Sequence, residues 1–128
     1  MPHVIALVDD LMFLSRIRET ARATGAEVLS ARSTADAIAA ARAGGRLVLV
    51  DAEAARLPWA EALAALRGEP ALRALPVVAF VSHVHPERAE AATAAGASRV
   101  LSRGAFVREL PGLLAAAPPA TLSQENRP

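Results

Sequence analysis

Acidic residues directly follow two of the apolar runs in this sequence. Asp9 and Asp10 come after "HVIALV", and Asp51 comes after "RLVLV", with Glu53 shortly behind it. Carboxylates brought close together raise one another's pKa values or need a cation, and Mg²⁺ prefers such oxygen ligands. A single acid at a strand end more often caps the following helix or turn, so a site is predicted only if the two acidic segments meet.

The elements that must position these acids can be read from the apolar pattern. Five runs with branched side chains predict strands, and the Ala-, Arg- and Glu-rich segments between them predict helices. The predicted strands cover residues 3–8, 26–31, 46–50, 76–81 and 98–102. The predicted helices cover about residues 11–24, 34–43, 59–67, 86–95 and 106–117. Because Pro111 falls inside the last segment, that helix should either start late or carry a kink.

Capping residues support these boundaries. Ser33 and Thr34 precede the second predicted helix, and Pro86 suits the first turn of the fourth. Glycine stands where four of the helices should stop, at Gly25, Gly44, Gly68 and Gly96.

The order of the elements predicts an α/β fold with a doubly wound, five-stranded parallel sheet. The first, third and fourth strands are almost continuously apolar, as expected for strands covered on both faces, and each crossover is long enough to make neighbouring strands parallel. In such sheets, ligands bind beyond the carboxyl ends of the strands, where the winding reverses. The acids lie at these strand ends.

Composition narrows the possible classes of protein. The 128 residues suit one domain, predicted over residues 1–117 with a flexible tail at 118–128, and 53% hydrophobic content is ample for its core. The absence of cysteine excludes disulfides and thiolate metal sites. A net charge of +1 gives no support for nucleic-acid binding, and no apolar segment is long enough to predict a membrane span. We therefore expect a cytoplasmic protein.

All its basic residues are arginine, so no mechanism here can use a lysine ammonium group.

Three segments together resemble the receiver domain of bacterial response regulators, of the stand-alone chemotaxis-regulator type. "VIALVDD" is similar to the first strand and acidic pair of that family, and "RLVLVDAE" to its phosphoacceptor strand. "LRALPVVAFVSHVHPERAEAATAAGASRVLSR" is similar to its fourth strand through its fifth. The resemblance covers about residues 3–117 and implies a flavodoxin-like receiver fold with strand order 2-1-3-4-5. It also implies a role in two-component phosphorelay signalling by protein contact, between a histidine kinase and a downstream target.

The resemblance assigns roles to the acids. It implies that Asp51 accepts a phosphoryl group and that Asp9, Asp10 and Asp51 hold Mg²⁺, with the backbone carbonyl of Glu53 as a further ligand. Such a metal would neutralise carboxylate and phosphate and align them for displacement. No enzyme activity is expected beyond magnesium-dependent acceptance and loss of this phosphoryl group.

The residues that would respond to the phosphoryl group depart from the family pattern. Val81 stands where the family has a Thr or Ser, and valine has no hydroxyl. Ser82 follows it but would face the other way in a regular strand. Arg103 and Gly104 replace a Lys-Pro pair, and we expect Arg103 to face the pocket. Val100 stands where an aromatic residue is frequent.

The resemblance also suggests a face for partners or weak dimerisation, formed by Arg88, Arg99, Val100 and Arg108. The chain is accordingly expected to be a monomer or a weak dimer. The departures favour an alternative in which the protein is a pseudo-receiver, a docking module that binds its partner without phosphorylation.

Two further classes of protein are weaker alternatives. Asp51 and Glu53 match the acid-x-acid start of aspartyl-phosphate phosphatases, but those enzymes need a Lys and a longer chain. A nucleotide-binding domain would need a glycine-rich turn, and "DDLMFLS" contains no glycine. His83 and His85 are expected to be exposed loop residues, and Trp59 is expected to pack at the start of the third helix.

Overall fold

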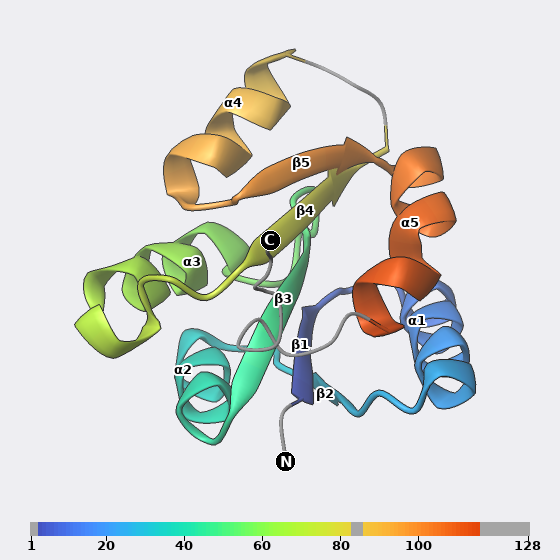
Figure 1. Cartoon of the computed structure of the whole chain (residues 1–128). Coiled ribbons are helices and arrows are strands. Elements are labelled where there is room, and N and C mark those ends of the chain that lie inside the picture. The colour runs from blue at the N-terminus through green and yellow to red at the C-terminus, as the bar shows by residue number, and fades with distance from the viewer. Residues whose placement is uncertain (1–2, 83–85, 116–128) are drawn as a thin grey trace, which may run out of the picture.

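The computed structural model describes residues 3–82 and 86–115, in which strands and helices alternate (Figure 1). The strands are β1 (His3–Leu7), β2 (Val28–Ser30), β3 (Gly45–Asp51), β4 (Val77–Val81) and β5 (Arg99–Ser102). The helices are α1 (Leu11–Thr24), α2 (Thr34–Arg42), α3 (Trp59–Gly68), α4 (Pro86–Ala95) and α5 (Arg103–Ala115), with a short 3₁₀ helix at Pro70–Leu72.

The five strands form one parallel sheet in the order β2-β1-β3-β4-β5, which confirms the predicted fold class and strand order. Figure 1 shows α1 and α5 on one face of the sheet and α2, α3 and α4 on the other. The winding reverses between β1 and β3, whose register pairs Leu7 with Val50. The acids that follow β1 therefore lie beside the end of β3.

Side chains alternate between the two faces of the sheet and form two core clusters. In the cluster under α2 and α3, Ile5 and Val48 pack against small helix residues such as Ala37 and Ala62. Alanine at these positions lets the helices lie close to the sheet. The cluster under α1 and α5 has larger side chains, including all three phenylalanines of the chain: Phe13, Phe80 and Phe106.

The last helix differs from its prediction. We expected a helix near residues 106–117 that would either start late or carry a kink at Pro111. The early start is the difference, because α5 begins at Arg103 and continues through Pro111. The Ser102 hydroxyl oxygen accepts a hydrogen bond from the Ala105 backbone N–H (3.1 Å), which satisfies a donor in the first turn and supports the early start. The helix tolerates the proline because its buried side, at Phe106, Leu110 and Leu114, stays packed on the sheet.

Other differences are smaller. The second strand covers only Val28–Ser30, and the short 3₁₀ helix was not predicted. His83, His85, the domain boundary at residue 117 and the predicted tail at 118–128 lie outside the described residues. None of the helices in residues 3–82 and 86–115 is long and apolar enough to cross a membrane.

The predicted cap at Ser33 is confirmed, and it allows a test of local stability. Its hydroxyl oxygen accepts a hydrogen bond from the Asp36 backbone N–H at 3.0 Å. Ser33→Ala should lower the free energy of unfolding by about 1 kcal/mol, because α2 loses the partner of a first-turn donor. Urea unfolding followed by circular dichroism measures the change.

The control is Thr20→Ala, since the Thr20 hydroxyl donates to the Arg16 carbonyl of its own helix and caps no helix end. Its removal should change the free energy of unfolding by less than about 0.5 kcal/mol. Equal losses in the two variants would contradict the capping role of Ser33.

Candidate functional site

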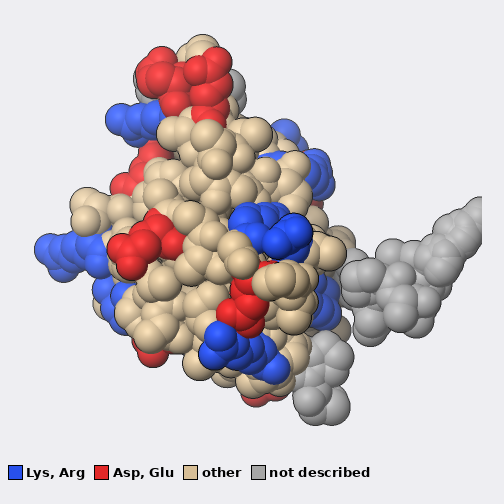
Figure 2. All heavy atoms as spheres, turned by 90° about the vertical axis from the view of Figure 1, so that its left-hand side faces the viewer, with Lys and Arg blue, Asp and Glu red and all other residues tan. Residues whose placement is uncertain are grey.

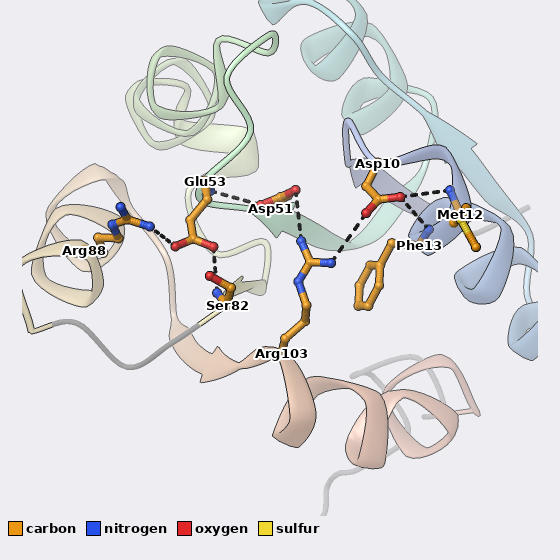
Figure 3. Close-up of polar contacts among 8 residues, drawn as sticks. All are labelled: Asp10, Met12, Phe13, Asp51, Glu53, Ser82, Arg88 and Arg103. Carbon is orange, nitrogen blue, oxygen red and sulfur yellow. Dashed lines mark hydrogen bonds and ion pairs between the residues drawn. The ribbon is translucent and has the colours of Figure 1, made fainter.

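The acids at the ends of β1 and β3 do not form one cluster. Asp51 ends β3 and is buried, with 4% of its surface exposed. Asp10 is the exposed N-cap of α1, and Asp9 forms an ion pair with Arg32 (3.3 Å). The carboxylates of Asp10 and Asp51 face a common centre, and a guanidinium group occupies it (Figure 3).

Asp10 has two tasks. One carboxylate oxygen accepts hydrogen bonds from the backbone N–H groups of Met12 (2.9 Å) and Phe13 (3.1 Å), which caps α1. The other oxygen lies 3.6 Å from the Arg103 guanidinium. The bond from Phe13, more than the nearby arginine, holds the pKa of Asp10 below its ordinary value. Asp10 is therefore ionised in its role as a cap.

The side chain of Asp51 is much more buried than that of Asp10. Its Oδ1 accepts a hydrogen bond from the Glu53 backbone N–H (3.0 Å), and its Oδ2 lies 3.8 Å from Arg103. Burial raises the pKa of Asp51 above its ordinary value, and the Glu53 bond and the Arg103 charge offset this only in part. Asp51 is therefore the more buried of the two pocket carboxyls and the one that takes up a proton more easily.

Arg103 is the first residue of α5, and its side chain reaches into the pocket as the sequence predicted (Figure 3). Nη1 faces Asp10 and Nη2 faces Asp51. The guanidinium carbon lies 4.6 Å from the ring centre of Phe13 and 5.5 Å from that of Phe80. These distances allow cation–π attraction to both rings.

The aromatic seat under Arg103 was not predicted. Phe13 from α1, Phe80 from β4 and Phe106 from α5 form one cluster, with ring centres 4.4–5.7 Å apart. Phe80 and Phe106 are fully buried. The available signal was that the only phenylalanines in the chain stand on three segments that approach the acid pocket.

Glu53 contributes contacts to the pocket through its side chain as well as through its backbone. Its Oε1 accepts a hydrogen bond from the Ser82 backbone N–H (2.6 Å), and its Oε2 pairs with Arg88. Burial acts to raise the pKa of Glu53, but the bonds from Ser82 and Arg88 outweigh it and leave the pKa below its ordinary value. An ionised side chain therefore joins the ends of β3 and β4 to the first turn of α4 (Figure 3).

The predicted switch positions lie beside this connection. Val81 ends β4 with 1% of its surface exposed, and its side chain offers no hydrogen-bonding group. Ser82 follows the strand and is exposed. Val100, on β5, is half-buried and packs against the core cluster under α2 and α3.

The residues present do not fit a bound divalent cation in this arrangement. Among the described residues, no group of three or more His, Cys, Asp or Glu side chains could hold a metal ion. Asp9 faces Arg32, and the Arg103 guanidinium lies between the other two carboxylates. The three-carboxylate set implied by the family resemblance is therefore not assembled here.

The remaining predicted residues are placed as follows. Arg99 pairs with Glu109 (3.0 Å) across β5 and α5, and Arg108 is exposed. Trp59 begins α3 and packs, half-buried, against the core cluster under α2 and α3, as expected. Of the four residues predicted for a partner face, only Arg88 contacts the pocket, through Glu53.

Comparisons with known proteins place the fold. No protein-family model matches the sequence, and no curated protein matches it. Among solved structures, a response regulator from Hahella chejuensis superposes with a TM-score of 0.76 at 20% identity, over 90% of this chain and 93% of that one. The chemotaxis response regulator CheY4 of Vibrio cholerae gives 0.73 at 22% identity, over 89% and 96%. The Mn²⁺-bound form of response regulator Rcp1 gives 0.70 at 16% identity, over 91% and 97%.

These similarities and the strand order define a doubly wound α/β domain of the flavodoxin-like type. Within that class, the chain has the CheY-like fold of response-regulator receiver domains. The predicted resemblance is confirmed at this level.

Proposed function

We propose that this protein is a receiver-like signalling protein that acts by contact with a partner protein, and that this contact does not depend on a phosphoryl group at Asp51. The observation that carries the proposal is the position of Glu53. Its carboxylate already accepts the Ser82 N–H at the end of β4 and pairs with Arg88 of α4. An anion supplied by the chain itself thus joins α4 to the pocket.

Two features of the pocket support this proposal. Val81 has no hydroxyl with which to bind a phosphoryl group, so its movement would bring no donor to Asp51. The Asp51 side chain is only 6% exposed, which limits its approach to a phosphodonor. The residues that would accept and sense phosphorylation are both poorly suited to it.

The surface supports a protein partner. Figure 2 shows acidic and basic side chains interspersed over the face formed by α2, α3 and α4, with acidic groups gathered over one end of α4. The whole sequence carries a net charge of +1. No broad basic surface on this face favours a nucleic acid, whose phosphates would need one.

A chemical experiment tests whether Asp51 is modified. The protein is incubated with Mg²⁺ and acetyl phosphate, and intact mass is measured beside a receiver domain that accepts phosphate under the same conditions. We expect no added phosphoryl mass on this chain. Titration with a beryllofluoride mimic should also leave Trp59 fluorescence unchanged.

A binding experiment tests whether the contact depends on Asp51. A partner is captured by cross-linking to the wild-type protein, purified, and titrated against Asp51→Asn, Glu53→Gln and wild type. Asp51→Asn should retain the wild-type affinity, whereas Glu53→Gln should weaken binding because it removes the charge that holds Arg88. Phosphoryl transfer to Asp51, together with loss of binding in Asp51→Asn, would instead establish a phosphoacceptor.

A further inference from the structure

We propose that Arg103 is a built-in cation that takes the place of a divalent metal ion, so that the acid pocket is complete without metal. The inference concerns metal binding and stands independently of whether Asp51 is phosphorylated. It begins from the disagreement between the metal site implied by the family resemblance and the arrangement observed here.

The charge balance of the pocket supports this role. Arg103 presents a different guanidinium nitrogen to each carboxylate, at 3.6 Å from Asp10 and 3.8 Å from Asp51. One positive group therefore lies between two acids that would otherwise repel each other. The third acid, Asp9, is neutralised separately by Arg32.

The start of a helix is an unfavourable place for the positive charge of Arg103 unless nearby groups stabilise it. As the first residue of α5, it lies at the helix end where the backbone dipole repels cations. Its Nε is buried and has no hydrogen-bond partner among the described residues. Attraction to the two carboxylates offsets both effects, and an arginine directed into solvent would avoid the burial.

The aromatic seat holds the guanidinium in the pocket. The rings of Phe13 and Phe80 lie within cation–π distance of the group, and the Arg103 side chain is only 33% exposed. A guanidinium is more weakly hydrated than an ammonium and stacks readily on aromatic rings. Arginine therefore suits this position better than lysine would.

The same geometry excludes a metal ion. Mg²⁺ requires oxygen ligands at about 2.0–2.1 Å in nearly octahedral geometry. An ion could bind Asp10 and Asp51 together only by displacing the guanidinium that lies between them. Loss of the arginine charge would leave two opposed carboxylates, which is an arrangement that attracts a divalent cation.

Mn²⁺ binding to the full chain tests this inference, measured by calorimetry and by the electron paramagnetic resonance signal of free Mn²⁺. The central variant is Arg103→Met, which keeps an apolar side chain over the rings but removes the charge. We expect Arg103→Met to bind Mn²⁺ at least about tenfold more tightly than wild type. Its thermal midpoint should rise on adding Mn²⁺, whereas the wild-type midpoint should be the same in Mn²⁺ and in EDTA.

Two controls identify the source of the effect. Arg108→Met makes the same change in charge on an exposed part of α5 and should leave Mn²⁺ binding at the wild-type level. Asp10→Asn added to Arg103→Met should abolish the gained binding. Wild-type binding as tight as that of Arg103→Met, or no binding by Arg103→Met while it remains folded, would overturn the inference.

If Arg103→Met does not fold, Arg103→Gln provides a second neutral variant. The titration of the wild-type protein also tests the inference without any variant, because tight Mn²⁺ binding by wild type would contradict it. Failure of the proposed function would be recognised separately, by phosphoryl mass on Asp51 together with loss of partner binding in Asp51→Asn. A protein that meets both conditions but excludes Mn²⁺ would retain the built-in cation and lose the docking proposal.

Discussion

Replacement of Arg67 by alanine is expected to lower the free energy of unfolding by about 3 kcal/mol. Arg67 lies in the last turn of α3, and its guanidinium donates to three backbone carbonyls. The acceptors are Gly96 (2.7 and 2.9 Å), Arg73 (2.6 Å) and Leu75 (2.8 Å). Alanine would leave these carbonyls without this partner, in loops that no regular ladder satisfies.

The packing around Arg67 strengthens this expectation. Gly96 has a φ of +128°, and a Cβ there would lie 2.8 Å from the Arg67 Cγ, so the turn between α4 and β5 is built closely around the arginine. Arg67 also donates to the Ser98 hydroxyl (3.2 Å), which in turn accepts the Val77 N–H (3.1 Å). One side chain thus fastens the connections that lead into β4 and β5.

Arg42→Ala is the matched control for Arg67→Ala. Arg42 also ends a helix, but it forms a bidentate ion pair with Glu69 at the surface, and 63% of its side chain is exposed to solvent. Exposed pairs contribute little, so the expected loss is below about 1 kcal/mol. Urea unfolding of both variants measures the difference. Similar losses would show that Arg67 acts only as a surface charge.

The contrast between Arg67 and the strands shows what the sequence could predict. Five branched apolar runs and long crossovers are local signals, and they identified the sheet. Arg67 donates hydrogen bonds to backbone carbonyls in two separate connections, one of them 29 residues away at Gly96. Every residue has a backbone carbonyl, so no residue type in the sequence marks these acceptors. The early start of α5 was not predicted for a related reason. The sequence shows Pro111, which disfavours a helix, but it does not show the tertiary packing that stabilises the helix despite this proline.

The candidate site also contains features that the sequence could predict and features that it could not. The sequence located Asp10, Asp51 and Arg103, because residues at the carboxyl ends of neighbouring parallel strands must come together. It could not show that Asp9 pairs with Arg32, or that Glu53 reaches Ser82. Those contacts depend on side-chain direction, which follows from tertiary packing rather than from spacing. The sequence predicts that Arg103 faces the pocket, but it does not show that the guanidinium lies between Asp10 and Asp51.

The second large effect concerns the aromatic seat. Phe80→Ala is expected to lower the free energy of unfolding by about 4 kcal/mol, the usual cost of truncating a buried phenylalanine. Phe80 is fully buried in β4 and paired in register with Asp51, and its ring centre lies 4.8 Å from that of Phe13 and 4.4 Å from that of Phe106. Its loss leaves a cavity between the sheet and the two helices α1 and α5.

Phe80→Leu separates the two contributions of this ring. Leucine refills much of the cavity but provides no aromatic face to Arg103, so its smaller loss should combine imperfect packing with the missing cation–π attraction. Trp59 packs against the core cluster under α2 and α3 and therefore reports on the opposite face of the sheet. Urea unfolding followed by Trp59 fluorescence and by circular dichroism should give the same midpoint in each variant, because the sheet couples its two faces into one transition. A loss in Phe80→Ala no greater than that in Phe80→Leu would show that the core closes around the missing ring, and the aromatic cluster would then be a weak support for the charged pocket above it.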